Sequence, residues 1–325
     1  MSVKLIAVDM DGTFLDDEKK YNKTKFLAQY AQLKQQGIKF VVASGNQYFQ
    51  LKSFFPEIAS EIAFVAENGA YIVNQGQDVS VAEISMASVV QILEFLDKIP
   101  GLRTVICGKN SAWIQSSQPE DFYLKMNRYY HRLQKIESYE EIDDTIFKFA
   151  LNISDEHLAE FMTSLDNVLG HIITPVSSGH GSADLIIPGR HKANGLRILQ
   201  KIWGIDDSEV VTFGDGGNDV EMLQQAGFGF SMANAMPQAT AAARYRTVSN
   251  NEEGVLKVID KVLVGKLLLN EWRFMSAFRF NINTVGSPPT LAQRVLNETL
   301  WNPAFFCCCN TAAALVTMAV FQVPT

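Results

Sequence analysis

Cysteine is scarce through most of this chain of 325 residues. Before residue 265 the only cysteine is Cys107, so that part cannot contain an internal disulfide and fits a reducing compartment. A long apolar run is missing from the N-terminus, because only Leu5 to Val8 precede Asp9. This argues against a signal peptide, and we expect a cytoplasmic protein.

An excess of positive charge is also lacking, since 28 Lys and Arg stand against 35 Asp and Glu for a net charge of −7. Such a balance gives no electrostatic reason to bind nucleic acid or an anionic membrane. An anionic ligand must then be held by a local site. The hydrophobic content of 47% argues against disorder, and the length suggests two domains, or one domain with an attachment.

Residues 265–325 differ in composition from the rest. They hold three of the four Cys and two of the four Trp, and Ala304 to Val323 is an uncharged run. Its length suits a membrane span, although Asn310 and Thr317 interrupt it. The segment is either a C-terminal membrane anchor or the result of translation past a frameshift or fusion point. We favour the second interpretation, which predicts a poorly packed tail.

Short apolar runs predict buried strands of a parallel sheet. Small or polar residues follow each run, and ligands of open α/β sheets collect at the carboxyl ends of the strands. Helical patterns separate several runs, as from Thr24 to Gln36, where Gly37 ends the helix. The pattern is typical of a doubly wound, Rossmann-like α/β core. The runs are residues 5–8, 40–43, 62–66 and 210–213.

The pattern changes between residues 84 and 187, where helical stretches alternate with strand-like pieces. This predicts an inserted α+β cap with an antiparallel sheet, through which hinge closure could exclude water. The expected organisation is a catalytic core from residues 1–83 and 188–264, a cap from 84–187 that selects the substrate, and the tail.

The first candidate for chemistry is Asp9-Met10-Asp11-Gly12-Thr13. Alternate residues of an extended strand share a face, so Asp9 and Asp11 can point the same way, and Gly12 permits a sharp turn. Two carboxyl groups this close raise each other's pKa unless a cation is present. A divalent cation with oxygen ligands, which points to magnesium, would resolve that conflict.

Three further motifs follow this segment along the chain, namely Ser44-Gly45, Lys192 and Gly214-Asp215-Gly216-Gly217-Asn218-Asp219. Together the four motifs resemble the haloacid dehalogenase-like phosphohydrolases, and within them the Cof-type sugar phosphatases, over about residues 2–264. The family implies that Asp9 attacks phosphorus to form an aspartyl phosphate, and that Asp11 protonates the leaving group and then activates water.

The resemblance also implies a ligand set. Magnesium would be held by the Asp9 carboxylate, the Asp11 backbone carbonyl and the Asp215 carboxylate, with Asp219 orienting a water in the second shell. Ser44 has a second interpretation, as the N-cap of a helix that begins near Gln47. Substrate contacts are implied for Thr13, Ser44, Gly45, Lys192 and Asn218.

The chain departs from the family pattern at two places. Asn46 stands where many relatives have Arg, which removes one basic substrate contact, and Gly216-Gly217 could loosen the metal loop. The resemblance, especially to enterobacterial members, implies small sugar phosphates such as fructose 1-phosphate and erythrose 4-phosphate as substrates. In the cap, His180 or Asp184 could meet sugar hydroxyls, or residues 178–182 could be only a hairpin turn.

The prediction is a magnesium-dependent phosphoric monoester hydrolase acting on small phosphorylated sugars. Two alternatives remain. A phosphotransferase or phosphomutase would use the same intermediate, and a non-catalytic sugar-phosphate sensor would bind without turnover.

Overall fold

A computed structural model describes residues 3–152, 155–179 and 182–265. His180 and, apart from Gly265, the atypical tail lie outside the described residues, so both interpretations of the tail stay predictions. Within the described ranges, no helix is both long and apolar enough to cross a membrane.

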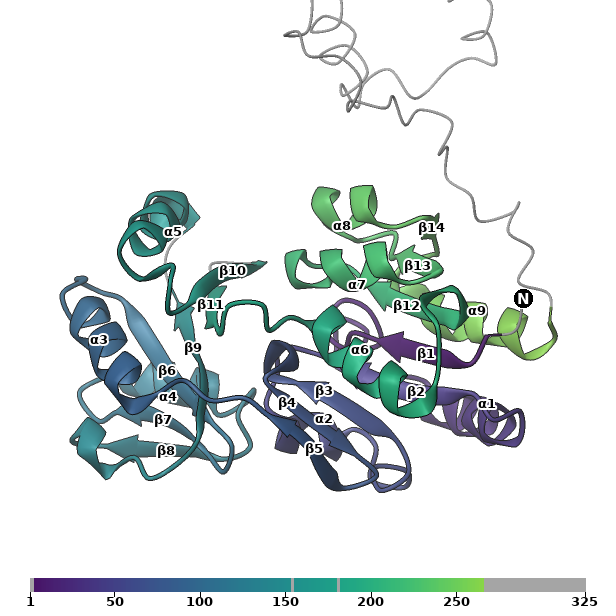
Figure 1. The fold of residues 1–325 in the computed structure, drawn as a ribbon, viewed down its shortest axis with the longest axis horizontal. Helices are drawn as coiled ribbons and strands as arrows, with labels where there is room; N and C mark the ends of the chain where they lie inside the picture. The colour runs from purple at the N-terminus through teal and green to yellow at the C-terminus, as the bar shows by residue number, and fades with distance from the viewer. Residues whose placement is uncertain (1–2, 153–154, 180–181, 266–325) are drawn as a thin grey trace, which may run out of the picture. The chain divides into compact units, whose positions relative to one another are not determined.

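The core is built on an eight-stranded sheet with the order β14-β13-β12-β1-β2-β3-β4-β5. The strands from β14 to β3 run parallel, and β4 and β5 continue the sheet as an antiparallel pair (Figure 1). The predicted strands are present and differ by no more than one residue at an end. The bounds are β1 Leu5–Val8, β2 Lys39–Ala43, β3 Ala63–Ala66, β4 Tyr71–Asn74, β5 Gln77–Val81, β12 Val210–Gly214, β13 Phe228–Ser231 and β14 Tyr245–Arg246.

Helices cover both faces of this sheet because its strands are apolar on both sides. In β1, Ile6 and Val8 pack into one hydrophobic cluster, and Leu5 and Ala7 pack into another. The first cluster includes side chains of α1, α2 and α9, and the second includes side chains of α6 and α7. The doubly wound core is thereby confirmed. The bounds are α1 Lys23–Gln35, α2 Tyr48–Ser53, α6 Lys192–Trp203, α7 Val220–Gln225, α8 Pro237–Ala242 and α9 Gly254–Leu263.

The cap has its own six-stranded sheet, with the order β10-β11-β9-β6-β7-β8. The expected antiparallel pairing holds except between β7 and β8, which pair in parallel. The bounds are α3 Met86–Leu96, β6 Arg103–Gly108, β7 Ala112–Gln115, α4 Glu120–Met126, β8 Leu133–Ile136, β9 Ile146–Asn152, α5 Asp155–Leu169, β10 Thr174–Gly179 and β11 Ser182–Ile186.

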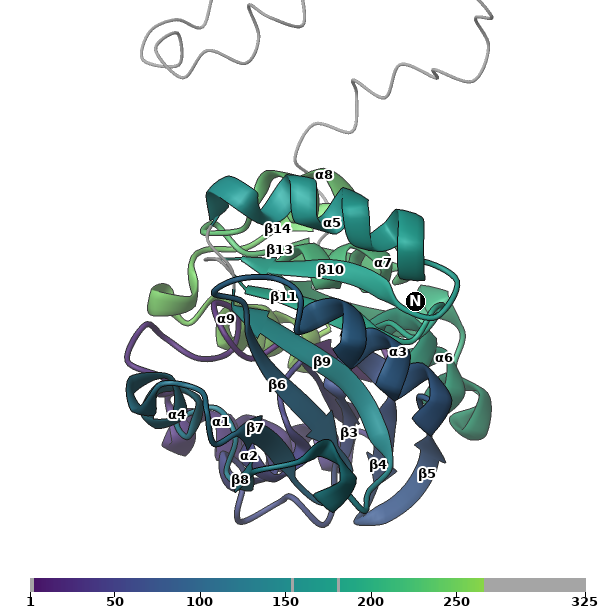
Figure 2. The same ribbon diagram turned by 90° about the vertical axis from the view of Figure 1, so that its left-hand side faces the viewer.

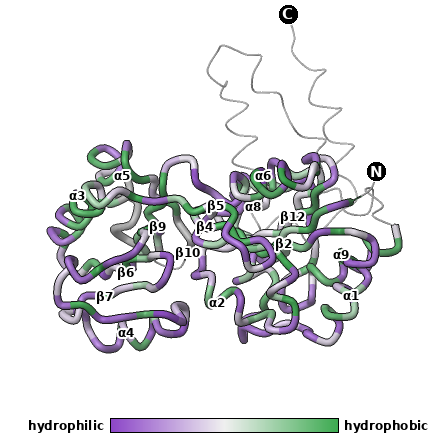
Figure 3. Tube along the Cα trace, turned by 60° about the horizontal axis from the view of Figure 1, so that its bottom comes forward, coloured by the Kyte–Doolittle hydropathy of each residue, from purple (hydrophilic) through white to green (hydrophobic). Residues whose placement is uncertain are grey.

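Helices α3 and α5 cover one face of the cap sheet (Figure 2). Helix α3 buries Val89, Ile92, Leu93 and Leu96, whose spacing of three and four residues places them on one side of the helix. Hydrophobic and hydrophilic stretches accordingly alternate along this helix (Figure 3). On the other face of the sheet, Phe122 of α4 packs with Val105 and Cys107 of β6.

Parallel pairing brings the ends of distant strands together. Strand β1 pairs with both β2 and β12, and β2 pairs with β3, all in the same direction. The residues that follow these four strands therefore meet at one edge of the sheet. They include Asp9, Ser44, Glu67 and Asp215.

Candidate active site

Three carboxyl groups meet at this edge. Asp9, Asp215 and Asp219 each present an oxygen, and these oxygens lie within 4.8 Å of one another. Lys192, the first residue of α6 and only 1% exposed, donates to Asp9 Oδ1 at 2.7 Å and to Asp219 Oδ1 at 2.6 Å. Its side chain is thus not a solvated surface lysine but the counter-charge of the cluster.

Burial and mutual repulsion perturb these groups. Burial raises the pKa of Asp9 well above its usual value; Lys192 opposes this effect, while the carboxyl groups of Asp219 and Asp215 add to it. Burial and the nearby Asp219 raise the pKa of Asp215 to about 6. Burial disfavours the charged form of Lys192, but Asp219 and Asp9 outweigh it, so the lysine pKa is raised. One lysine therefore stands against three carboxyl groups. A bound cation would stabilise the ionised form of these carboxyl groups.

The loop after β12 is held by Asp219, which is fully buried. Asp219 Oδ2 accepts from the backbone N–H of Asp215 and of Gly216, each at 2.9 Å. These bonds fix the loop that Gly216-Gly217 was expected to loosen. With both oxygens of Asp219 already accepting, Asp9 and Asp215 have more capacity left for a cation.

Gly12 and Thr13 support Asp215 from the opposite side. Gly12 has a φ of +74°, and a Cβ built there would lie 2.4 Å from Asp215 Oδ2, so no larger residue fits without displacing that carboxylate. Thr13 donates its hydroxyl proton to Asp215 Oδ1 at 2.7 Å. Because Thr13 does not line the cleft, its substrate contact stays a prediction.

Asp11 lies beside the carboxyl cluster and has partners of its own. Asp11 Oδ1 accepts from Lys19 Nζ, and Asp11 Oδ2 accepts from Asn46 Nδ2, both at 2.6 Å. Asn46, the departure from the family pattern, therefore orients Asp11. Lys19 also lines the cleft and supplies a positive charge that the sequence analysis did not identify.

Ser44 and Gly45 form the turn that follows β2. The capping interpretation of Ser44 is wrong for α2, because Gln47 directly precedes that helix and Ser44 Oγ instead accepts from the backbone N–H of Asn46 at 3.2 Å. Among the described residues, none accepts the hydroxyl proton of Ser44. That proton is available to a ligand in the cleft.

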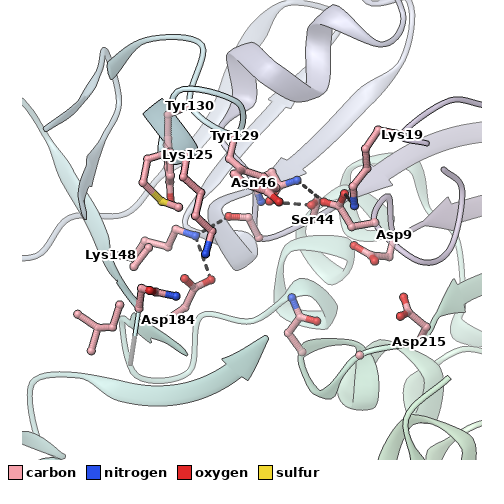
Figure 4. Close-up of a pocket in the computed structure, with 18 of the residues that line it drawn as sticks. Asp9, Lys19, Ser44, Asn46, Lys125, Tyr129, Tyr130, Lys148, Asp184 and Asp215 are labelled. Atoms are coloured by element: carbon pink, nitrogen blue, oxygen red, sulfur yellow. Dashed lines mark hydrogen bonds and ion pairs between the residues drawn. The ribbon is translucent and has the colours of Figure 1, made fainter. Parts of the chain in front are cut away.

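A cavity of about 340 Å³ joins these residues to the cap. Residues from the core form one side of it, among them Asp9, Asp11, Ser44, Asp215 and Asn218. The cap contributes charged and aromatic side chains to the other side (Figure 4). They include Phe122, Lys125, Tyr129, Tyr130, Lys148 and Asp184.

A buried polar network crosses from core to cap within this cleft. Lys148 Nζ of β9 donates to the Gly45 carbonyl at 2.5 Å, lies 3.0 Å from Asp184 Oδ2 and lies 3.3 Å from Glu67 Oε2. Asn68 joins it, donating to Asp184 Oδ2 at 2.7 Å and accepting from Asn218 Nδ2 at 3.0 Å. Asn218 therefore already donates a hydrogen bond to Asn68, which in turn donates one to Asp184 of the cap.

Glu67 and Asn68 belong to the polar residues that follow the apolar run 62–66, but the sequence did not single them out, and it did not single out Lys148. A signal for Lys148 exists, since it is the one charged residue in the apolar strand Ile146–Asn152. Glu67 and Asn68 have φ values of 51° and 54°, a left-handed conformation that side chains other than glycine rarely adopt. Asparagine is enriched in this conformation, whereas nothing in the local sequence indicates it for Glu67.

The donor set fits a divalent cation. The oxygens of Asp9 and Asp215 are hard ligands of the kind that magnesium prefers, and three carboxyl groups gather around the single positive charge of Lys192. A metal bound by these oxygens would relieve that repulsion.

Comparison with known proteins identifies the family. The sequence profile of the haloacid dehalogenase-like hydrolases matches residues 6–259. The chain belongs to this family. It is 57% identical over 263 residues to the Escherichia coli (strain K12) protein named 5-amino-6-(5-phospho-D-ribitylamino)uracil phosphatase YbjI, with 81% of this chain and 97% of the relative covered. The predicted enzyme class, a phosphoric monoester hydrolase of this family, is confirmed.

Solved structures agree with the fold. SMU.1108c from Streptococcus mutans UA159 is 34% identical, with a TM-score of 0.78 over 81% of this chain and 100% of that one. The protein titled HAD subclass IIB sugar phosphatase BT4131 gives a TM-score of 0.67 at 23% identity, over 79% of this chain and 98% of that one, and shows the fold alone.

Proposed function

We propose that this haloacid dehalogenase-like hydrolase is a magnesium-dependent phosphatase that hydrolyses small sugar phosphates through an aspartyl-phosphate intermediate. The observation that carries the proposal is the buried Asp9, which faces the cleft while its Oδ1 is ion-paired to Lys192 at 2.7 Å. The proposal keeps the division into a core of residues 1–83 and 188–264 and a cap of 84–187, and a cytoplasmic location.

The first half-reaction transfers the phosphoryl group to the enzyme. The Asp9 oxygen that Lys192 does not hold attacks phosphorus, and Asp11 gives its proton to the departing alkoxide. Ser44 Oγ and the Gly45 N–H donate to the phosphoryl oxygens, while Lys192 offsets the negative charge that accumulates. Lys19 and Asn46 hold the Asp11 carboxyl group in place for this transfer.

The second half-reaction releases phosphate. Asp11, now deprotonated, takes a proton from a water molecule, and that water attacks the phosphorus of the aspartyl phosphate. The bond to Asp9 breaks, inorganic phosphate leaves, and both carboxyl groups return to their starting states. A magnesium ion held by Asp9, Asp215 and the Asp11 carbonyl would supply charge stabilisation to the phosphoryl oxygens in both steps.

The substrate proposal has two candidates, a small sugar phosphate and a phosphorylated ribitylaminouracil. Fructose 1-phosphate and erythrose 4-phosphate follow from the resemblance to sugar phosphatases. The name of the Escherichia coli relative adds 5-amino-6-(5-phospho-D-ribitylamino)uracil, whose phosphate is carried by a ribityl chain. Tyr129 of the cap lines the cleft, is 36% exposed and supports this second candidate, because its ring offers an aromatic surface to a flat ring of the substrate.

The test is phosphate release from these esters in the presence of magnesium. We expect Asp9→Asn to reduce release to background while the protein stays folded, because an amide cannot attack phosphorus. The control is Asp121→Asn, which changes a carboxylate that is 75% exposed in α4 and lies outside the cleft. Its rate should match that of the unchanged protein.

The same assay separates the alternatives. A phosphotransferase would move phosphate to an added sugar acceptor instead of releasing it, and a sensor would bind the esters without turnover. Magnesium-dependent phosphate release by pure, folded Asp9→Asn protein would contradict the proposed mechanism.

A further inference from the structure

Asp184 faces the cleft as a consequence of strand pairing. It lies in β11 opposite Ala150 of β9, and residues paired across two strands share a face of the sheet. Lys148 and Ala150 lie on that face, while the intervening Phe149 packs into the hydrophobic cluster under α3 and α5. Asp184 is therefore on the cleft side of the cap sheet (Figure 4).

The two oxygens of Asp184 have different surroundings. Oδ2 accepts from Lys148 Nζ and from Asn68 Nδ2, whereas Oδ1 accepts from no residue in the described part of the chain. The side chain is only 9% exposed, yet it lines the cavity. A carboxylate oxygen in so sheltered a place is stabilised by a donor that a ligand brings.

Asp184 also lies close to the proposed phosphate-binding turn. A Cβ built on Gly45 would be 3.3 Å from Asp184 Oδ2, and Lys148 bridges Asp184 to the Gly45 carbonyl. A carboxylate repels a phosphate dianion, so the phosphoryl group itself cannot occupy the place next to Oδ1. A neutral donor attached to the phosphate by a few bonds can.

We propose that Asp184 is a specificity-determining residue whose Oδ1 accepts a hydrogen bond from a hydroxyl group of the leaving alcohol, close to the phosphorylated carbon. The inference rests on the proposed phosphatase function and refines its substrate class. The enzyme selects phosphate monoesters of polyols and sugars over esters of plain alcohols. Lys148 and Asn68 act on Asp184 as positioning residues, because they fix Oδ2 and leave Oδ1 turned to the substrate.

The test compares two esters with the same four-carbon chain, erythritol 4-phosphate and n-butyl phosphate. We expect kcat/KM of the unchanged protein to favour erythritol 4-phosphate by about tenfold or more, as a hydrogen bond to a charged group provides. Asp184→Asn should bring the two values close together. Since Lys148 and Asn68 both donate to the Oδ2 position, the amide oxygen should lie there and the NH₂ group should face the cleft, where it replaces a charged acceptor with a donor.

Asp144→Asn is the matched control, because Asp144 is a cap carboxylate that accepts from Asn110 and Ser111 outside the cleft. It should leave the preference unchanged. Asp184→Glu, which keeps the charge, provides a second variant if the asparagine protein does not fold, and it should alter the preference by moving the carboxylate.

Binding separates this inference from the proposed function. Calorimetry with Asp9→Asn protein, with and without Asp184→Asn, measures the preference for the hydroxylated ester when no phosphate is released. Equal kcat/KM and equal binding of the two esters by protein with Asp184 in place would overturn the inference, as would a full preference in folded Asp184→Asn protein. Absence of phosphate release from every ester, with the binding preference intact, would overturn only the proposed function.

Discussion

Lys192 provides the positive charge that two carboxyl groups of the candidate site share. It is buried and bonded to two carboxyl groups of a three-carboxyl cluster. Removing one partner of a buried ion pair leaves the other charges uncompensated, at a cost of about 3–5 kcal/mol. We expect Lys192→Met to lower the free energy of unfolding by about this amount without metal, and to lose most phosphatase activity.

Denaturant unfolding in EDTA and in magnesium measures this effect. Magnesium should return part of the lost stability if the proposed metal binds the remaining carboxyl groups. The control is Lys4→Met, because Lys4 pairs with Glu209 at the protein surface, where solvent screens the ion pair and its contribution to stability is small. A Lys192→Met protein as stable as the Lys4→Met protein would contradict the assignment of Lys192 as the counter-charge.

Glu67 makes stability depend on pH. Burial raises its pKa from 4.5 to about 7, although the nearby Lys148 opposes the shift. Between these two values the folded state keeps a proton that the unfolded state has lost, so the free energy of unfolding falls as pH rises. The loss is complete above pH 7 and amounts to at most about 3–4 kcal/mol, since the shift from 4.5 to about 7 is about 2.5 pKa units and one unit corresponds to about 1.4 kcal/mol.

Glu67→Gln should remove this dependence. We expect the variant to lose less stability than the unchanged protein between pH 5 and pH 8, when unfolding is followed in EDTA at both pH values. Glu94→Gln, at an exposed position on α3, is the control and should leave the dependence as it is. Identical pH dependence in the Glu67→Gln and Glu94→Gln proteins would show that Glu67 does not hold the proton.

At the scale of elements, the packing of α6 against β3 positions Lys192. Gly195 lies one turn into α6, and a Cβ built there would be 2.4 Å from Val65 Cγ1. Overpacking a core costs about 1–3 kcal/mol, and the higher helix propensity of alanine returns about 1 kcal/mol. We expect Gly195→Ala to destabilise the protein by about 1 kcal/mol net and to slow phosphate release, because the start of α6 moves.

A double-mutant cycle tests this packing. In a Val65→Ala background the methyl group that Gly195→Ala adds has room, so this substitution should be neutral or stabilising there. Thermal unfolding of the four proteins gives the coupling. Additive effects of the two substitutions would mean that Gly195 and Val65 do not constrain each other.

Elements with a clear local pattern could be predicted closely. The run from Leu5 to Val8 matches β1, and the helix expected from Thr24 to Gln36 is α1 displaced by one residue. The parallel pairing of β7 with β8 was missed, because strand direction depends on the connection between strands and not on their composition. The capping of α2 was misassigned because Ser44 bonds within its own turn.

At the scale of the whole molecule, the family match ends well before the chain does. The profile covers residues 6–259, and α9 ends at Leu263. We expect a chain that stops at Gly265 to fold and to release phosphate at the rate of the full chain, since every residue of the candidate site precedes that point. Phosphate-release assays on the full and the shortened chain, run in parallel, compare their rates. Fractionation of both proteins into soluble and membrane pools compares their distribution. A truncated protein that is inactive or unfolded would show that residues 266–325 support the enzyme.

The sequence by itself determined the chemistry of the core edge. Asp9, Asp11, Ser44 and Asp215 follow short apolar runs, and such runs report strand ends because burial on both faces demands continuous apolar residues. The division into core and cap was predicted from the change of pattern between residues 84 and 187, which separates the apolar runs of the core.

Only the tertiary structure decided how the cap meets that edge. Lys148 reaches the Gly45 carbonyl from 103 residues away, and Asp184 reaches Asn68 from 116 residues away. No local periodicity encodes contacts between two separate sheets, and each of these side chains has a polar character that would suit the surface equally well. Chain folding buries them together, and burial gives Glu67 its raised pKa and leaves one oxygen of Asp184 facing the cleft.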